Sequence, residues 1–249
     1  MEEQAAEVQM SETPDLSAKI RQWLISGYVG VAFTAAMLFI PAWRLDWVMG
    51  WVYVALWLLW HTATALVLIP TDPELIAERT GPKKGIKDWD TMLISVVGLA
   101  TLAQGVVAGL DVRFGWTRQL WPQVRPEVVL VPQIVASVVA TAGRALGVWA
   151  MAANSFFSKV VRIQRDRGQT VVTGGPYRTV RHPGYVGEII FNLSAPVMLG
   201  SVWTCIPTTI VLVLYVVRTA LEDRTLREEL EGYAAYARSV RYRLLPGVW

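Results

Sequence analysis

The sequence predicts an all-α membrane protein, a single polytopic bundle of about six transmembrane helices. Hydrophobic residues make up 53% of the 249 positions and charged residues only 17%, whereas soluble domains carry about 25% charged residues. Mean hydropathy is +0.38. The apolar residues form successive stretches of roughly 20, each long enough to cross ~30 Å of hydrocarbon. They lack the two-residue alternation that is typical of a β-barrel.

The spans follow from these apolar stretches in order. The last two meet at Gly200 and Ser201, and so short a joint predicts a C-terminal helical hairpin. Residues 1–20 read as a flexible tail, because they are polar and acidic and lack the basic start of a signal peptide. Residues 21–249 are then one membrane domain. The expected spans are residues 22–43, 48–69, 91–110, 128–153, 184–199 and 202–220.

The positions of Lys and Arg predict the orientation. With the N-terminus in the cytoplasm, 18 of the 23 basic residues fall on the cytoplasmic side and four on the other, and Arg144 lies inside the fourth span. The positive-inside rule therefore favours cytoplasmic placement of both termini. The net charge of +3 is too small to indicate nucleic acid. A single cysteine, Cys205, excludes an internal disulfide and a cysteine metal cage, and no metal site is expected.

The densest basic motif is TGGPYRTVRHPGYVG, residues 173–187. Its glycines and prolines predict an ordered loop that feeds a helix, and a helix start favours an anion. Arg178 and Arg181 therefore have two interpretations. They form a basic anchor beside the membrane, or they line a pocket for an anionic ligand that lies partly in the membrane.

A second polar motif begins where the last span ends. Glu222 and Asp223 oppose the basic bias there, so a function for them is expected. The local alternative is an ion pair between Glu222 and Arg218 at i,i+4. Gly232 should interrupt the helix that continues from this span. The final RYRLLPGVW is expected to dock through its leucines and Trp249.

Other residues within the spans read as structural. Gly105 with Gly109, and Gly143 with Gly147, have the small-residue spacing of close helix packing. His61 is expected to be a hydrogen-bonded histidine, and Arg144 is expected to pair or to point inward.

GPYRTVRHPGYVG, the hairpin and LEDRTLREELEGYAAYARSVRYRLLPGVW together closely resemble the isoprenylcysteine carboxyl methyltransferase-like membrane proteins. Phospholipid methyltransferases share the C-terminal pattern. The resemblance is strongest over residues 154–249, which would form the cofactor-binding part on the cytoplasmic face. DPELIAERTGPKKGIKDWD, residues 72–90, also looks like the prokaryotic branch of this family.

The resemblance implies S-adenosylmethionine as cofactor and methyl transfer to a lipophilic acceptor. That acceptor would be a lipophilic small molecule or a lipidated one. Its methylated group would be a carboxylate rather than a phospholipid amine or a thiol. The protein would also be in contact with membrane lipids. Arg181 and Glu222 are the candidate catalytic residues. Asp223 stands where the family often has a second glutamate, which leaves its role open. The implied cofactor-binding residues are Gln164, Tyr177, Arg178, His182, Tyr185, Gly187 and Glu222.

Two other classes of function remain open from the sequence. A membrane sterol or steroid reductase carries a related C-terminal pattern and uses NADPH, whose 2′-phosphate the spare arginines of residues 154–183 could bind. A non-catalytic membrane scaffold would not need His182 or Glu222. Comparing the binding of labelled S-adenosylmethionine with that of NADPH separates the methyltransferase, the reductase and the scaffold. The sequence does not indicate the oligomeric state.

Overall fold

The computed structural model describes residues 16–123 and 126–249, and the secondary structure of these residues is helical. The all-α prediction is therefore confirmed for the part of the chain that the structure describes. The tail prediction for residues 1–15 and the position of Arg125 lie outside it. Residues 16–20, which were assigned to the tail, belong instead to the first long helix, which begins at Leu16.

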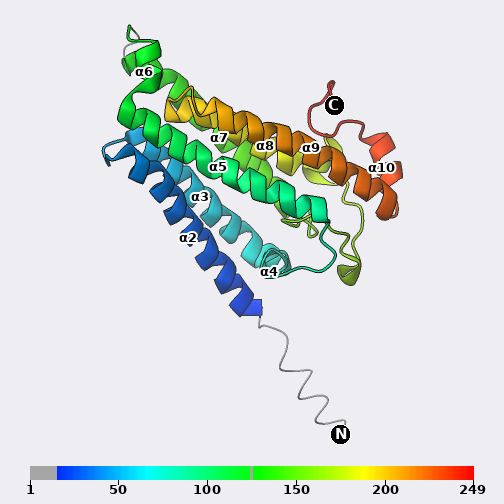
Figure 1. Ribbon diagram of the computed structural model, residues 1–249. Coiled ribbons are helices and arrows are strands. Elements are labelled where there is room, and N and C mark those ends of the chain that lie inside the picture. Colours follow the sequence, from blue (N-terminus) through cyan, green and yellow to red (C-terminus); the bar gives the residue numbers. More distant parts are fainter. Residues whose placement is uncertain (1–15, 124–125) are drawn as a thin grey trace.

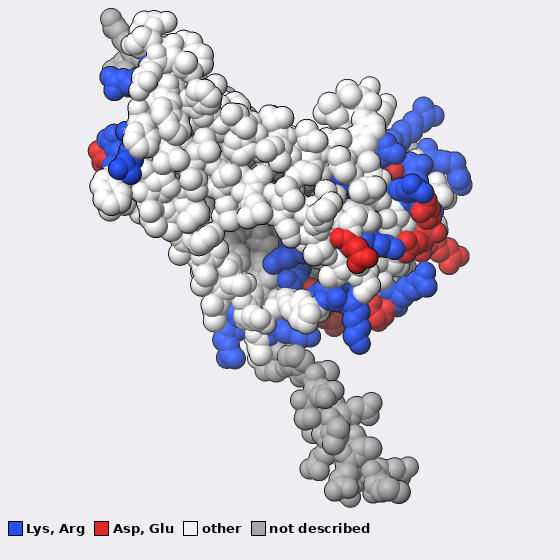
Figure 2. Space-filling model, viewed as in Figure 1, with Lys and Arg blue, Asp and Glu red and all other residues white. Residues whose placement is uncertain are grey.

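Within the described residues, five helices are long and apolar enough to cross a membrane, which indicates a multi-pass membrane protein. They run side by side in one bundle (Figure 1). A band without Lys, Arg, Asp or Glu separates two charged ends on the face shown in Figure 2. The five are α2 (Leu16–Ala42), α3 (Val48–Thr71), α5 (Asp88–Phe114), α7 (Pro126–Ala152) and α9 (Cys205–Glu229).

The predicted fifth span corresponds to a helix at the short end of the transmembrane range. Helix α8 (Pro183–Leu199) has 17 residues, which gives it a length of about 26 Å at 1.5 Å per residue. The hydrocarbon core is ~30 Å thick. The expectation of about six spans is therefore not confirmed. The helical hairpin itself is confirmed, because Gly200 ends α8 in the left-handed region at φ 68° and α9 returns beside α8.

Short helices gather at the more highly charged end of the bundle. Gly232, at φ 81°, separates α9 from α10 as predicted. Helix α6 lies at the opposite end, near the connection between α2 and α3 (Figure 1). The short elements are α4 (Pro73–Glu78), α6 (Trp116–Leu120), α10 (Tyr233–Ser239) and the 3₁₀ helices η1 (Arg165–Arg167) and η2 (Gly175–Arg178).

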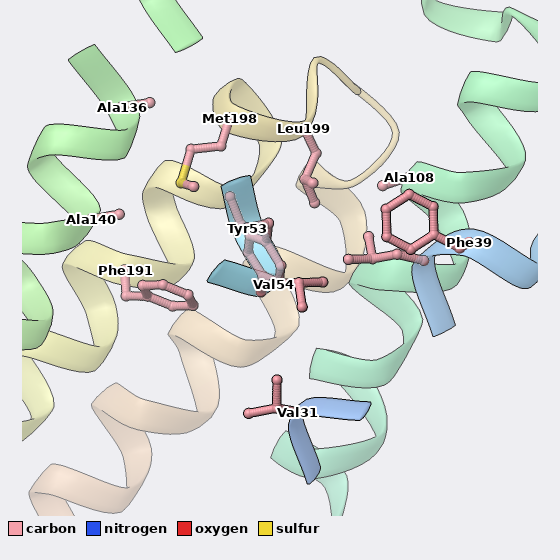
Figure 3. Packing of buried hydrophobic residues seen from close by; sticks show 12 residues of the cluster. Val31, Phe39, Tyr53, Val54, Ala108, Ala136, Ala140, Phe191, Met198 and Leu199 are labelled. Atoms are coloured by element: carbon pink, nitrogen blue, oxygen red, sulfur yellow. The ribbon is translucent and has the colours of Figure 1, made fainter. Parts of the chain in front are cut away.

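The buried core lies where α2, α3, α5, α7 and α8 meet (Figure 3). Phe191 and Met198 of α8 pack there with Tyr53 of α3, and all three side chains are almost fully removed from the surface. This packing holds α8 between the other helices, and the start of α8 carries the motif residues.

Glycines bring pairs of helices into backbone contact. A Cβ at Gly187 would lie closer to the carbonyl oxygen of Gly143 than van der Waals contact allows, and a Cβ at Gly143 would lie 2.8 Å from the carbonyl oxygen of Gly187. Gly109 meets the backbone of Leu38 in the same way. The prediction that the two small-residue patterns serve helix packing is confirmed for α7 against α8 and for α5 against α2.

We expect the change Gly187→Ala to destabilise the protein, because the added methyl group meets backbone atoms that cannot rotate away. The expected loss is ~1–3 kcal/mol, measured by thermal or detergent-induced unfolding. Gly147→Ala is the matched control on α7, since no atom lies within 4 Å of its added Cβ. That change should be neutral or slightly stabilising. Equal stability of the two variants would contradict close α7–α8 packing.

Candidate functional site

A cavity of about 910 Å³ lies between the bundle and the connector that follows α7. Side chains from α2, α3, α5, α7, α8 and α9 line it, and Figure 2 shows a hollow with basic side chains beside it on one face of the molecule. Its lining joins residues that are distant in sequence. The predicted site residues that line the cavity are Gln164, Tyr177, Arg181, His182, Tyr185 and Glu222.

Glu222, Tyr185 and His182 form one polar cluster on the cavity wall. The Tyr185 hydroxyl donates a hydrogen bond to Glu222 Oε2. The His182 ring stacks on Tyr185 with centroids 5.8 Å apart, and its Nδ1 lies 4.0 Å from Glu222 Oε1. The local alternative, a Glu222–Arg218 ion pair, is wrong because Arg218 donates instead to Asp90 at 2.6 and 3.1 Å. Glu222 is therefore left without a Lys or Arg partner among the described residues.

Asp223 is the buried centre of an ion-pair network. Its carboxylate accepts from Arg181 Nε and Nη2 at 2.7 and 3.1 Å, and from the Tyr233 hydroxyl at 3.0 Å. Arg227 and Arg243 also donate to it, at 3.0 and 2.9 Å. The side chain of Asp223 is fully buried. Asp223 therefore holds together the loop before α8, helices α9 and α10, and the C-terminal segment. Its side chain, which is shorter than that of a glutamate, is fully engaged in these contacts.

Arg181 binds the C-terminal segment as well as Asp223. Its Nη1 donates to the carbonyl oxygens of Val240 and Arg241 at 2.7 and 2.8 Å. The backbone N–H groups of Arg181 and His182 donate to residues 242 and 243. Arg181 is thus engaged within the protein, which gives its candidate catalytic role no support. The prediction that the C-terminal segment docks through its two leucines is only partly right. Leu244 is buried, whereas Leu245 is 55% exposed.

Gln164 and Tyr177 shape the connector wall of the cavity. Gln164 Nε2 donates to the carbonyl oxygen of Phe156 at 2.7 Å, and its Oε1 accepts from Arg167 at 2.7 Å. The Tyr177 hydroxyl accepts from Asn154 at 3.1 Å. Burial raises the pKa of Tyr177 well above its usual range, so the hydroxyl stays neutral. Both side chains therefore order the loop that surrounds the cavity.

Two predicted cofactor-binding residues lie elsewhere. Arg178 is exposed at the end of η2 and does not line the cavity. Gly187 is buried against Gly143 of α7, where it serves helix packing. The loop of residues 178–182 therefore offers the cavity no unpaired arginine, contrary to the expectation that this loop would receive the anionic part of a ligand.

An ion pair within the bundle also lines the cavity. The sequence predicted one of its two members, Arg144, but not its partner. Arg144 pairs as expected, and its partner is Glu188 at 2.6 Å. The Arg144 guanidinium carbon lies 4.2 and 3.8 Å from the ring centroids of Trp57 and Phe191, whose π faces favour a cation. Glu188 could have been found from the sequence, because it is a lone carboxylate within an apolar stretch. His61 lines the cavity from α3, with Nε2 3.3 Å from the carbonyl oxygen of Leu24.

Residues 134–228, from α7 to α9, match the family model for the isoprenylcysteine carboxyl methyltransferase (ICMT) family. Over this segment the chain is similar to that family. The resemblance predicted from the motifs is thereby confirmed, and the matched segment includes His182, Tyr185 and Glu222.

Two curated relatives of this methyltransferase type give the extent of the similarity. A probable protein-S-isoprenylcysteine O-methyltransferase of Oryza sativa subsp. indica is 31% identical over 43% of this chain and 53% of its own length. The protein-S-isoprenylcysteine O-methyltransferase of Mus musculus is 36% identical over 31% of this chain and 26% of its own length. The chain thus spans about half the length of the rice relative and about a quarter of that of the mouse relative.

Proposed function

We propose that this protein transfers a methyl group from S-adenosylmethionine to the carboxylate of a lipophilic acceptor such as an isoprenylated cysteine. One observation carries the proposal. Glu222, Tyr185 and His182 converge on the wall of one cavity, within the segment that matches the methyltransferase family model. The names of the relatives support an O-methyltransferase over a reductase or a scaffold.

The side chains at this end of the cavity fit the chemistry of the cofactor. Glu222 has no Lys or Arg partner among the described residues, so its carboxylate could accept hydrogen bonds from ribose hydroxyls or from the cofactor's amine. The rings of Tyr233 and Tyr236, which also line the cavity, offer flat apolar faces. When bound, the cofactor supplies an electrophilic methyl group on a sulfonium sulfur.

The opposite part of the cavity is suited to an apolar acceptor. Its wall includes Val31 and Phe33 of α2, Trp57 of α3 and Leu102 of α5. A carboxylate acceptor loses no proton on methylation, so the protein needs no general base. The protein contributes by aligning the carboxylate with the methyl group and by excluding water. Alignment of two reactants can lower an activation barrier by ~7–11 kcal/mol. An amine acceptor would instead require His182 or Glu222 to take a proton.

The charge distribution supports an orientation with both termini in the cytoplasm. The start of α2, α4 and α10 lie at the same end of the bundle (Figure 1), and the charged side chains gather around α10 (Figure 2). Sealed vesicles of known orientation test this. The charged cofactor cannot cross the bilayer, so it should support methyl transfer only when it is added to the side on which tags at both termini are accessible.

The proposed function predicts two measurable properties of the purified protein in nanodiscs. S-adenosylhomocysteine should bind with measurable heat in calorimetry, and labelled methyl should pass to an S-isoprenylated cysteine with a free carboxyl group. The matched acceptor with a carboxamide should receive none, since it offers no carboxylate nucleophile. Absence of both heat and thermal stabilisation at millimolar S-adenosylhomocysteine, with the protein folded, would overturn the proposal.

A further inference from the structure

The basic residues that line the cavity divide into two kinds. Four arginines each form an ion pair with a carboxylate: Arg144 with Glu188, Arg162 with Glu78, Arg181 with Asp223 and Arg218 with Asp90. Two other cations, Arg79 and Lys159, line the same cavity without a carboxylate partner among the described residues. This second kind supplies positive charge that the protein itself does not neutralise.

Arg79 is fixed beside the connector with part of its guanidinium unused. Nη1 donates to the carbonyl oxygen of Phe157 at 3.0 Å, and the guanidinium carbon lies 5.5 Å from the centroid of the Phe157 ring. Nε is buried and has no hydrogen-bond partner. The neighbouring Glu78 is not available, because its carboxylate already accepts from Arg162 at 2.9 Å and from Lys83 at 3.2 Å.

The backbone at Lys159 is held in place, and the residue lines the cavity while it keeps contact with solvent. Arg218 Nη2 donates to the carbonyl oxygen of Lys159 at 2.8 Å, while Arg218 itself is paired with Asp90. Asp90 in turn accepts from the backbone N–H of Val161 at 2.7 Å. The ammonium group therefore extends from a fixed backbone position.

Neither cation has a carboxylate at ion-pair distance among the described residues, although the more distant Glu188 favours the charged form of Arg79. Partial removal from water beside the cavity, and then the charge of Arg79, lower the pKa of Lys159 to about 8. Burial lowers the pKa of Arg79 to about 10. Both changes express the cost of a cation that lacks an anion, and a bound anion would offset that cost.

The position of the pair indicates what kind of anion would reach it. Arg79 follows α3 and α4, eight residues beyond the last residue of α3, and Lys159 lies seven residues beyond the last residue of α7. Both thus lie just outside the apolar helices, whereas Val31 and Leu102 line the cavity from within them. A ligand with a hydrocarbon chain in the apolar part would bring its head group to this level.

We propose that Arg79 and Lys159 form a subsite for the anionic oxygen head group, carboxylate or phosphate, of an amphiphile whose hydrocarbon chain occupies the apolar part of the cavity. This proposal rests on the proposed function, since an amphiphile with a carboxylate head group would be the methyl acceptor. Arg79 lies outside residues 134–228, so the match to the family model does not reach it.

Native mass spectrometry of the full chain, released from phosphatidylcholine nanodiscs, can count bound amphiphiles directly. Dodecyl phosphate and laurate should each bind the unaltered protein more tightly than dodecyltrimethylammonium does. R79Q and K159Q should each weaken binding of the two anions by roughly tenfold. R79K, which keeps the cation, should restore most of the affinity. K84Q is the matched control, because it removes an exposed charge nearby that does not line the cavity.

The outcomes separate this subsite from the methyltransferase proposal. Equal binding of the anionic and cationic amphiphiles, or equal losses in K84Q and R79Q, would overturn the subsite even if S-adenosylhomocysteine binds. Weaker S-adenosylhomocysteine binding in R79Q and K159Q, with unchanged binding of dodecyl phosphate and laurate, would also overturn it and assign the cations to the cofactor's carboxylate. Failure of the unaltered protein to bind S-adenosylhomocysteine contradicts the methyltransferase proposal alone.

Discussion

Replacing Asp223 by alanine is expected to lower the free energy of unfolding by ~3–5 kcal/mol. The substitution removes the carboxylate to which Arg181, Arg227 and Arg243 all donate. Arg181 would then be a buried cation without a counter-charge, since its side chain is only 1% exposed. Unfolding in denaturing detergent measures the loss. Limited proteolysis should also show that residues 240–249 become accessible.

The matched control for this change is Glu228→Ala on the same helix. Glu228 pairs with Arg224 at 2.8 Å, but both side chains are largely exposed. Such surface pairs contribute ~0.3–0.5 kcal/mol when they lie at i,i+4 on a helix. If Asp223→Ala and Glu228→Ala were equally stable, Asp223 would not be the centre of the network described above.

The changes His182→Ala and Glu222→Ala are each expected to weaken S-adenosylhomocysteine binding roughly ten- to a hundredfold. The loss of a hydrogen bond to a charged group costs ~1.5–3 kcal/mol. His182 directly precedes α8 and Glu222 lies on α9, yet both line one cavity wall. Because residues that share a ligand couple, the double variant should depart from additivity by at least ~0.5 kcal/mol. Calorimetric titration of the four proteins completes the cycle.

Glu229→Ala provides the control for this cycle, since Glu229 ends the same helix but does not line the cavity. It forms a partly exposed ion pair with Lys87 at 2.6 Å, and its loss should leave the cofactor affinity unchanged. Additive and near-neutral effects of His182→Ala and Glu222→Ala would mean that neither residue contacts the cofactor.

The course of the helices could be read from the sequence because burial in lipid requires long apolar stretches. The expected span at 48–69 corresponds to α3, and that at 128–153 to α7. The burial of α8 could not be predicted, because an apolar stretch of 17 residues looks the same whether it faces lipid or fills the core of a bundle. Phe191 and Met198 of α8 pack into that core, and Ser201, just beyond α8, donates a hydrogen bond to Asp111 near the end of α5.

The electrostatic partners could not be read from local spacing. Arg218 and Glu222 have the i,i+4 spacing of a helical ion pair, yet Arg218 pairs with Asp90, which is 128 residues away. Arg181 and Arg178 looked equivalent as loop cations, yet one is buried on Asp223 and the other is exposed. Such differences depend on which segments the tertiary fold brings together, and composition carries no record of that.

The glycine contact between α7 and α8 has a mechanical consequence for the cavity. With Gly143 and Gly187 in backbone contact, no lipid chain or side chain can pass between these two helices. They therefore act as a rigid unit, and that side of the chamber stays shut. Helices α5 and α2 are closed in the same way, because Gly109 meets the backbone of Leu38. A hydrophobic molecule therefore cannot leave the chamber through either of these two seams unless helix backbones separate.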